Sequence, residues 1–160
     1  MKKILIALDN NVGARKIAAT GYELSQTLNA QTFLLHVTSD STYYSTLNYS
    51  PIFGYDSFSN SDVIQENTVE ELKRIAQLYL DHAKWNLGDE KIQTILKEGD
   101  YAEAILQTAE EIKADIIVMG THGRKGLDKV LLGSVAEKVL HSTEIPLFII
   151  PVKAQEQKEL

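Results

Sequence analysis

Cysteine is absent from the 160-residue chain, which excludes a disulfide scaffold, a thiol nucleophile and any cysteine-ligated metal centre. Basic residues are also few, since 16 lysines and arginines stand against 22 acidic residues and leave a formal charge of −6. Duplex DNA and anionic membranes need a cationic face, so neither is expected as a partner. No apolar run approaches the ~18 residues of a membrane span. We therefore expect one soluble, cytoplasmic domain without nucleic-acid or membrane partners.

Two kinds of segment alternate along the chain. Short apolar runs rich in β-branched residues predict strands buried on both faces, and segments with apolar residues three and four positions apart predict amphipathic helices. The predicted strands are Lys3–Leu8, Thr32–Val37, Ile92–Leu96, Ile116–Met119 and Leu147–Ile150. Asp100 and Glu103 form a capping-box pattern before one helix, and Trp85 is expected to pack near the end of another. The alternation predicts an α/β fold with a parallel sheet and helices on both faces.

One long segment interrupts the alternation. Residues 39–62 contain seven serines and four tyrosines and show no clear period. They exceed the ~2–6 residues of an ordinary strand-to-helix connection. A lid or interface over a site and a mobile insertion both fit this composition. We expect a single domain over residues 1–152 with this insertion, followed by a polar tail at 153–160.

Glycines gather directly after the fourth predicted strand. Gly120, Gly123 and Gly126 fall within seven residues, and Arg124 adds positive charge between them. Glycines let main-chain N–H groups converge on an anion, and the N-terminus of the helix that begins near Ser134 favours an anion as well. The segment therefore predicts a phosphate-binding loop.

A second interpretation needs no ligand. Ser134 and Glu137 match a capping box, and glycines after a strand are often only turn residues. Other phosphate and catalytic motifs are missing: the sequence has no GxxxxGK[ST], no GxGxxG after the first strand and no GxSxG. His36 and His122 lack a carboxylate partner, so we expect no metal site. We also expect no catalytic residue.

The spacing Gly120-x2-Gly123-x9-Gly133-Ser134 resembles the nucleotide-binding signature of the universal stress protein family, in its ATP-binding branch. Further matches run along the chain, at Lys3–Asp9, Leu34–Val37, Gly99–Ile105, Asp115–Gly120 and Ile145–Pro151. The resemblance implies a five-stranded, Rossmann-like fold of the adenine nucleotide alpha hydrolase type, with strand order 3-2-1-4-5. It also implies a homodimer.

The resemblance further implies ATP across the carboxyl ends of the first and fourth strands. Asp9 would bond a ribose hydroxyl, the main chain of Val37 would meet the adenine edge, and Mg²⁺ would be held through the phosphates. The implied cofactor-binding residues are Ala7, Leu8, Asp9, Val37, Met119, Gly120, Gly123, Arg124, Gly133, Ser134 and Val135.

The implied function is an ATP-binding stress-response regulator with little or no intrinsic catalysis, because no candidate base stands out beyond Asp9 and the basic loop. Two alternatives stay open. One is a weak ATPase or phosphotransferase with Ser134 or Thr121 as phosphoryl acceptor, and the other is a dimeric interaction module with an empty nucleotide site. Pairing of the apolar strand Leu147–Ile150 with its copy would cover an exposed edge and form the dimer, unless helices of the same chain shield it.

Overall fold

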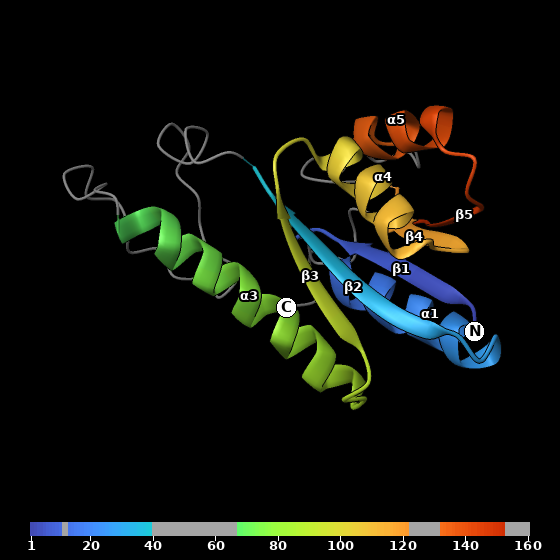
Figure 1. Cartoon of the computed structure of the whole chain (residues 1–160), viewed down its shortest axis with the longest axis horizontal. Coiled ribbons are helices and arrows are strands. Elements are labelled where there is room, and N and C mark those ends of the chain that lie inside the picture. The colour runs from blue at the N-terminus through green and yellow to red at the C-terminus, as the bar shows by residue number, and fades with distance from the viewer. Residues whose placement is uncertain (11–12, 40–66, 122–131, 153–160) are drawn as a thin grey trace.

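Five parallel strands form one sheet in the part of the chain that the computed structural model describes, residues 1–10, 13–39, 67–121 and 132–152. The strands are β1 (Lys3–Leu8), β2 (Gln31–Thr38), β3 (Gln93–Glu98), β4 (Ile116–Gly120) and β5 (Leu147–Ile150). Their order is β3-β2-β1-β4-β5, with every neighbouring pair parallel (Figure 1). The Rossmann-like α/β fold and the expected strand order are confirmed.

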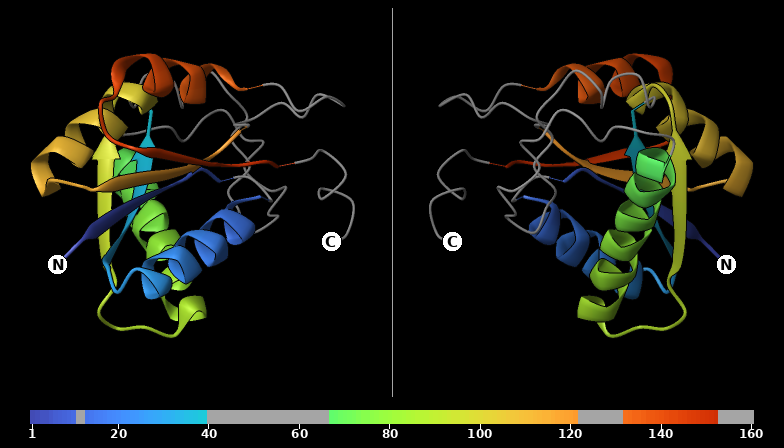
Figure 2. Two further views of the ribbon diagram at one scale, coloured as in Figure 1. Left: turned by 90° about the vertical axis from the view of Figure 1, so that its right-hand side faces the viewer. Right: turned by 90° about the vertical axis from the view of Figure 1, so that its left-hand side faces the viewer.

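Helices cover both faces of this sheet. They are α1 (Ala14–Thr27), α3 (Asn67–Leu87), α4 (Tyr101–Ile112) and α5 (Ser134–Ser142). Figure 2 shows α1 and α3 on one face and α4 and α5 on the other. No described helix combines the length and the apolar character that a membrane-spanning segment needs.

The central strand β1 is buried on both faces, as its apolar run predicts. Leu5 packs into the cluster on the α4–α5 side, whereas Ile4 and Ile6 pack into the cluster on the α1–α3 side. Successive side chains of a strand point to opposite faces, so one short apolar run supplies both cores. This arrangement explains why the chain alternates short strands with amphipathic helices.

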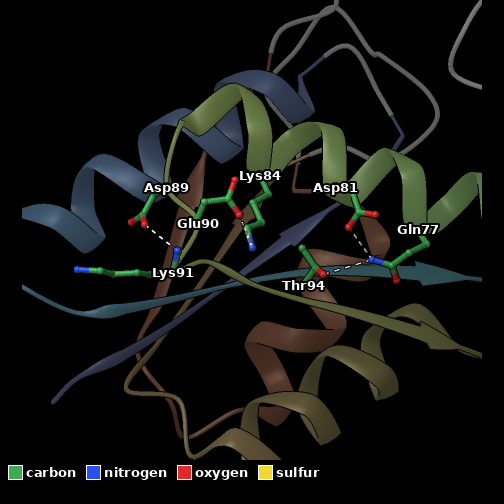
Figure 3. A network of polar contacts seen from close by, with 7 residues as sticks. All are labelled: Gln77, Asp81, Lys84, Asp89, Glu90, Lys91 and Thr94. Carbon is green, nitrogen blue, oxygen red and sulfur yellow. Dashed lines mark hydrogen bonds and ion pairs between the residues drawn. The ribbon is translucent and has the colours of Figure 1, made fainter.

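Helix α3 is fixed to the outer strand β3 by polar side chains (Figure 3). Gln77 Nε2 donates to Thr94 Oγ1 on β3 at 3.3 Å and to Asp81 Oδ1 on its own helix at 2.9 Å. Nearer the end of the helix, Lys84 and Glu90 form an ion pair at 3.4 Å. These contacts link α3 to β3 and to the turn that precedes it.

One detail of α3 differs from the sequence interpretation. Trp85, which was expected to pack, is 73% exposed and stacks on His82 with ring centroids 6.2 Å apart. The helix instead buries Leu80, which is fully enclosed beneath it. The outward face of α3 has no described element over it, so an aromatic residue at that angle stays at the surface.

Candidate functional site

The carboxyl ends of β1 and β4 lie side by side at the centre of the sheet. The chain proceeds from β1 through β2 to β3 on one side and from β4 to β5 on the other, so the strand order reverses between β1 and β4. Open α/β sheets bind ligands outside the carboxyl ends of their strands at such a switch point. The site is therefore expected at this edge.

Most of the predicted binding residues come together here. Those on the strands are Ala7, Leu8, Val37, Met119 and Gly120, with Asp9 following β1, and those at the start of α5 are Gly133, Ser134 and Val135. The remaining two, Gly123 and Arg124, lie outside the described residues, as do residues 40–62 of the insertion and the tail. The side chains of Ala7, Leu8, Val37 and Met119 are buried in the core. Any contact that these four make with a ligand must therefore come mainly from the main chain.

Thr121 ties the start of α5 to the ends of β4 and β5. Its carbonyl accepts a hydrogen bond from Gly133 N at 2.6 Å, and its own N–H donates to Ile150 O at 3.1 Å. Its hydroxyl accepts from Val152 N at 3.1 Å and is buried with the rest of the residue. Burial of this engaged hydroxyl argues against Thr121 as a phosphoryl acceptor, and its anchoring role was not predicted.

The N-terminus of α5 has no side-chain cap among the described residues. Gly133 is the N-cap, in an extended conformation with φ −65° and ψ 159°, and Ser134 is already the first helical residue. The capping box expected from Ser134 and Glu137 is therefore wrong, because the helix begins with a residue that has no side chain to offer. The N–H groups of a first helical turn have no partner within the helix, so this end is suited to an anion.

Gly120 has a packing role that its place in the glycine pattern did not reveal. A Cβ at this position would lie 2.5 Å from Ile17 Cδ1 and 3.3 Å from Val152 Cγ2. A Cβ at Gly13 would likewise collide with Val152. Gly120 lets α1 and the segment after β5 approach β4 closely, and Gly13 lets the start of α1 approach the segment after β5.

The main chain at Leu8 and Asp9 is held by two side chains that the sequence interpretation did not assign to the site. His36 Nδ1 lies 2.8 Å from Leu8 O, and Tyr79 Oη donates to Asp9 O at 2.6 Å. A histidine inside the apolar run of β2 was the signal available for the first contact. No sequence signal was available for the contact of Tyr79, because a tyrosine on the apolar face of α3 is explained by packing alone.

One buried hydroxyl at this edge has no hydrogen-bond partner within the described part of the chain. Ser39 Oγ, two residues beyond Val37, is buried and makes no hydrogen bond with the described residues. An unsatisfied buried polar group costs ~1–3 kcal/mol. The start of α5, which no described side chain caps, fits an anionic ligand bound at the strand ends. Within the described residues, no group of three or more His, Asp or Glu side chains is placed to hold a metal ion.

Comparison with known proteins decides the family. The profile of the universal stress protein family matches residues 1–151. The chain belongs to the universal stress protein family. Its match covers every described strand and helix, including both halves of the site.

Curated relatives of this universal stress protein agree along almost their whole length. Universal stress protein MJ0577 of Methanocaldococcus jannaschii is 31% identical over 156 residues, which cover 95% of this chain and 96% of the relative. Universal stress protein A homolog 1 of Coxiella burnetii is 31% identical over 141 residues, covering 88% and 89%. Stress response protein NhaX of Bacillus subtilis is 28% identical over 92% of this chain and 96% of its own.

Solved structures show the same fold. The structure of MJ0577 matches with a TM-score of 0.72 and 28% identity, covering 95% of this chain and 96% of that one. A universal stress protein solved in complex with cAMP matches with a TM-score of 0.60 and 19% identity, covering 94% and 96%. The second likeness concerns the fold alone.

Proposed function

We propose that this universal stress protein binds ATP across the carboxyl ends of β1 and β4 and acts as a stress-response regulator. Asp9 would bond the ribose, the main chain of Val37 would meet the adenine, and Gly133, Ser134 and Val135 would bind the phosphates. Met119 and Gly120 would line the ribose side. Gly123 and Arg124 belong to the proposed phosphate site through the family signature, with Mg²⁺ held through the phosphates.

The observation that carries this proposal is the N-terminus of α5, which no side chain in the described part of the chain caps and which Thr121 anchors to the end of β4. Its amides carry the positive end of the helix dipole, so a polyphosphate there gains both hydrogen bonds and charge complementarity. A universal stress protein with the same fold was solved in complex with cAMP, so this fold accommodates an adenine nucleotide in that protein. Apart from Asp9, which this proposal assigns to the ribose, we identify no candidate general base among the described residues at this edge, so we propose little or no hydrolysis.

The experiment that tests the proposal starts from gently purified protein. Mass spectrometry of the native protein should detect a bound adenine nucleotide, and calorimetry should give a saturable ATP isotherm. Gly133→Val should weaken ATP binding at least tenfold, with helicity unchanged, because the φ of −65° suits any residue while the added methyls fill the phosphate space. An interaction module with an empty site would show no nucleotide and no isotherm.

Weak phosphotransfer to Ser134 is a second candidate function, because this serine is exposed at the start of α5 beside the proposed phosphate position. Incubation with γ-labelled ATP separates it from simple binding. Label retained on the protein and lost in Ser134→Ala would support transfer, whereas protein without label would leave binding alone.

We further propose that the protein is a homodimer formed through β5. This strand is at the outer edge of the described sheet, and Phe148 on it is 42% exposed. An apolar strand edge invites pairing with another strand, and a second copy related by a two-fold axis would pair β5 with itself.

A further inference from the structure

The ladder of main-chain hydrogen bonds loosens at the very end of β1. The register of β1 with β4 ends at the pair Ile6 and Val118, whereas its register with β2 continues to Leu8 and His36. The strands thus separate just where the site opens. The main chain of β1 is paired on both sides as far as Ile6 and with β2 alone as far as Leu8, so Asp9 lies beyond both ladders.

Beyond the strand ladders, two side chains bind the main-chain carbonyls of Leu8 and Asp9. The carbonyl of Leu8 faces His36 Nδ1 at 2.8 Å, and the next carbonyl, that of Asp9, accepts from Tyr79 Oη at 2.6 Å. Because the partner of Nδ1 is a carbonyl, Nδ1 carries the proton. Successive carbonyls are therefore bound by residues from two different elements, β2 and α3.

The two side chains also support each other. The rings of His36 and Tyr79 meet edge to face, with centroids 5.1 Å apart and planes at 68°. His36 is buried, so its ring has little room to turn. Tyr79 stands on the helix that Gln77 and Lys84 tie to β3 and its preceding turn (Figure 3). The hydroxyl of Tyr79 is therefore presented by a helix that is packed and hydrogen-bonded against β3.

We propose that Tyr79, supported by His36, is a positioning residue of the nucleotide site that orients Asp9 toward the ribose. The carbonyls of Leu8 and Asp9 belong to the two peptide planes that flank the Cα of Asp9, so holding both sets the direction of the Cα–Cβ bond from which the carboxylate extends. A binding group held in its productive direction loses less freedom when the ligand arrives. This inference rests on the proposed nucleotide function and adds to it a residue 70 positions away from Asp9.

The hydrogen bond of Tyr79 could also serve only to stabilise the fold. The test must therefore show that Tyr79 changes ATP affinity through Asp9. Calorimetry with ATP is compared for the wild type, Tyr79→Phe, Asp9→Ala and the double variant. Tyr79→Phe should weaken binding about three- to tenfold, the worth of one hydrogen bond. In the Asp9→Ala background the same substitution should change the affinity little, because the group that it orients is gone.

Two further variants complete the experiment. Tyr22→Phe is the matched control, since Tyr22 Oη donates to Asp89 Oδ2 at 3.0 Å, in the turn that precedes β3. It should leave ATP affinity unchanged. His36→Asn should retain most of the affinity, because its amide can donate where Nδ1 does, whereas His36→Leu should lower it.

The outcomes separate the inference from the function on which it rests. If the wild type and Tyr79→Phe bind ATP equally well, the role of Tyr79 is overturned and the proposed function stands. Equal losses in the wild-type and Asp9→Ala backgrounds also overturn it, because Tyr79 would then act only on the fold. A wild type that binds no nucleotide overturns the proposed function and this inference with it.

Discussion

Lys138 on α5 donates from Nζ to Oδ1 of Asp100, the N-cap of α4, at 3.0 Å. The same oxygen accepts the N–H of Glu103 at 3.0 Å, as the capping pattern predicts. The pKa of Asp100 lies below its usual 3.8, first because of the bond from Glu103 N and then because of Lys138. One carboxylate therefore caps α4 and ties it to α5, the helix whose first turn forms the proposed phosphate site.

Asp100→Ala should lower the free energy of unfolding by about 1 kcal/mol at pH 7, the usual worth of an N-cap. Because the folded-state pKa is lowered, the stabilising contribution is complete above pH 3.8 and declines as the pH falls through the lower folded value. Urea denaturation at pH 7 and pH 3 should thus show a smaller gap between wild type and variant at pH 3. Asp100→Asn is the control that retains a capping side chain without the charge, and a gap that is equal at both pH values would contradict the assignment.

Gly133→Asp should separate stability from binding. Aspartate at an N-cap stabilises a helix by a few tenths of a kcal/mol over glycine, so thermal unfolding should change little. Its carboxylate would occupy the first-turn amides of α5 and repel a triphosphate, so ATP affinity should fall more than tenfold, an estimate from the cost of like charges at short range.

Gly133→Asn gives the matched comparison, since it caps without charge. The aspartate variant should bind ATP more weakly than the asparagine variant, and salt should narrow the difference. Calorimetry that finds equal ATP affinity for Gly133→Asp and the wild type would show that the phosphates lie elsewhere.

Gly120→Ala should destabilise the fold by about 1–3 kcal/mol, because the new Cβ would press on Ile17 Cδ1. Ile17→Val removes that carbon atom, at a cost of ~0.5–1.5 kcal/mol by itself. The double variant should be more stable than the sum of the two single effects. Chemical denaturation of the four proteins measures the coupling, and simple additivity would mean that the close contact is relieved in another way.

Phe148→Glu should convert the proposed dimer into a monomer, because a charge would enter the apolar edge that β5 is proposed to bury. Light scattering after size exclusion gives the mass directly. Trp85→Glu serves as the control, since Trp85 is a still more exposed aromatic residue on a different element. A monomeric wild type, or a Phe148→Glu protein that remains dimeric, would rule out this interface.

Strand and helix identities were readable from sequence because their signals are local. Apolar residues repeat every two positions in a strand and every three to four positions in a helix, so each pattern can be recognised within its own segment. A cap is local as well, since Asp100 caps a helix that begins one residue later. The first and last residues of a strand at the edge of the sheet were harder to predict from sequence. β3 runs over Gln93–Glu98 instead of Ile92–Leu96, because an outer strand keeps polar residues in its ladder. The strand order came from the family signature, since periodicity says nothing about which strands are neighbours.

The sequence by itself determined the alternation of elements, the family and the group of residues at the carboxyl edge, because each depends on short strings of residues. Only the tertiary structure decided how that edge is built. Thr121 anchors the start of α5, and Tyr79 binds the carbonyl of Asp9 across 70 positions of chain. Main-chain groups accept partners regardless of residue type, so such contacts leave no pattern in the sequence and arise only when the packed helices and sheet bring the atoms together.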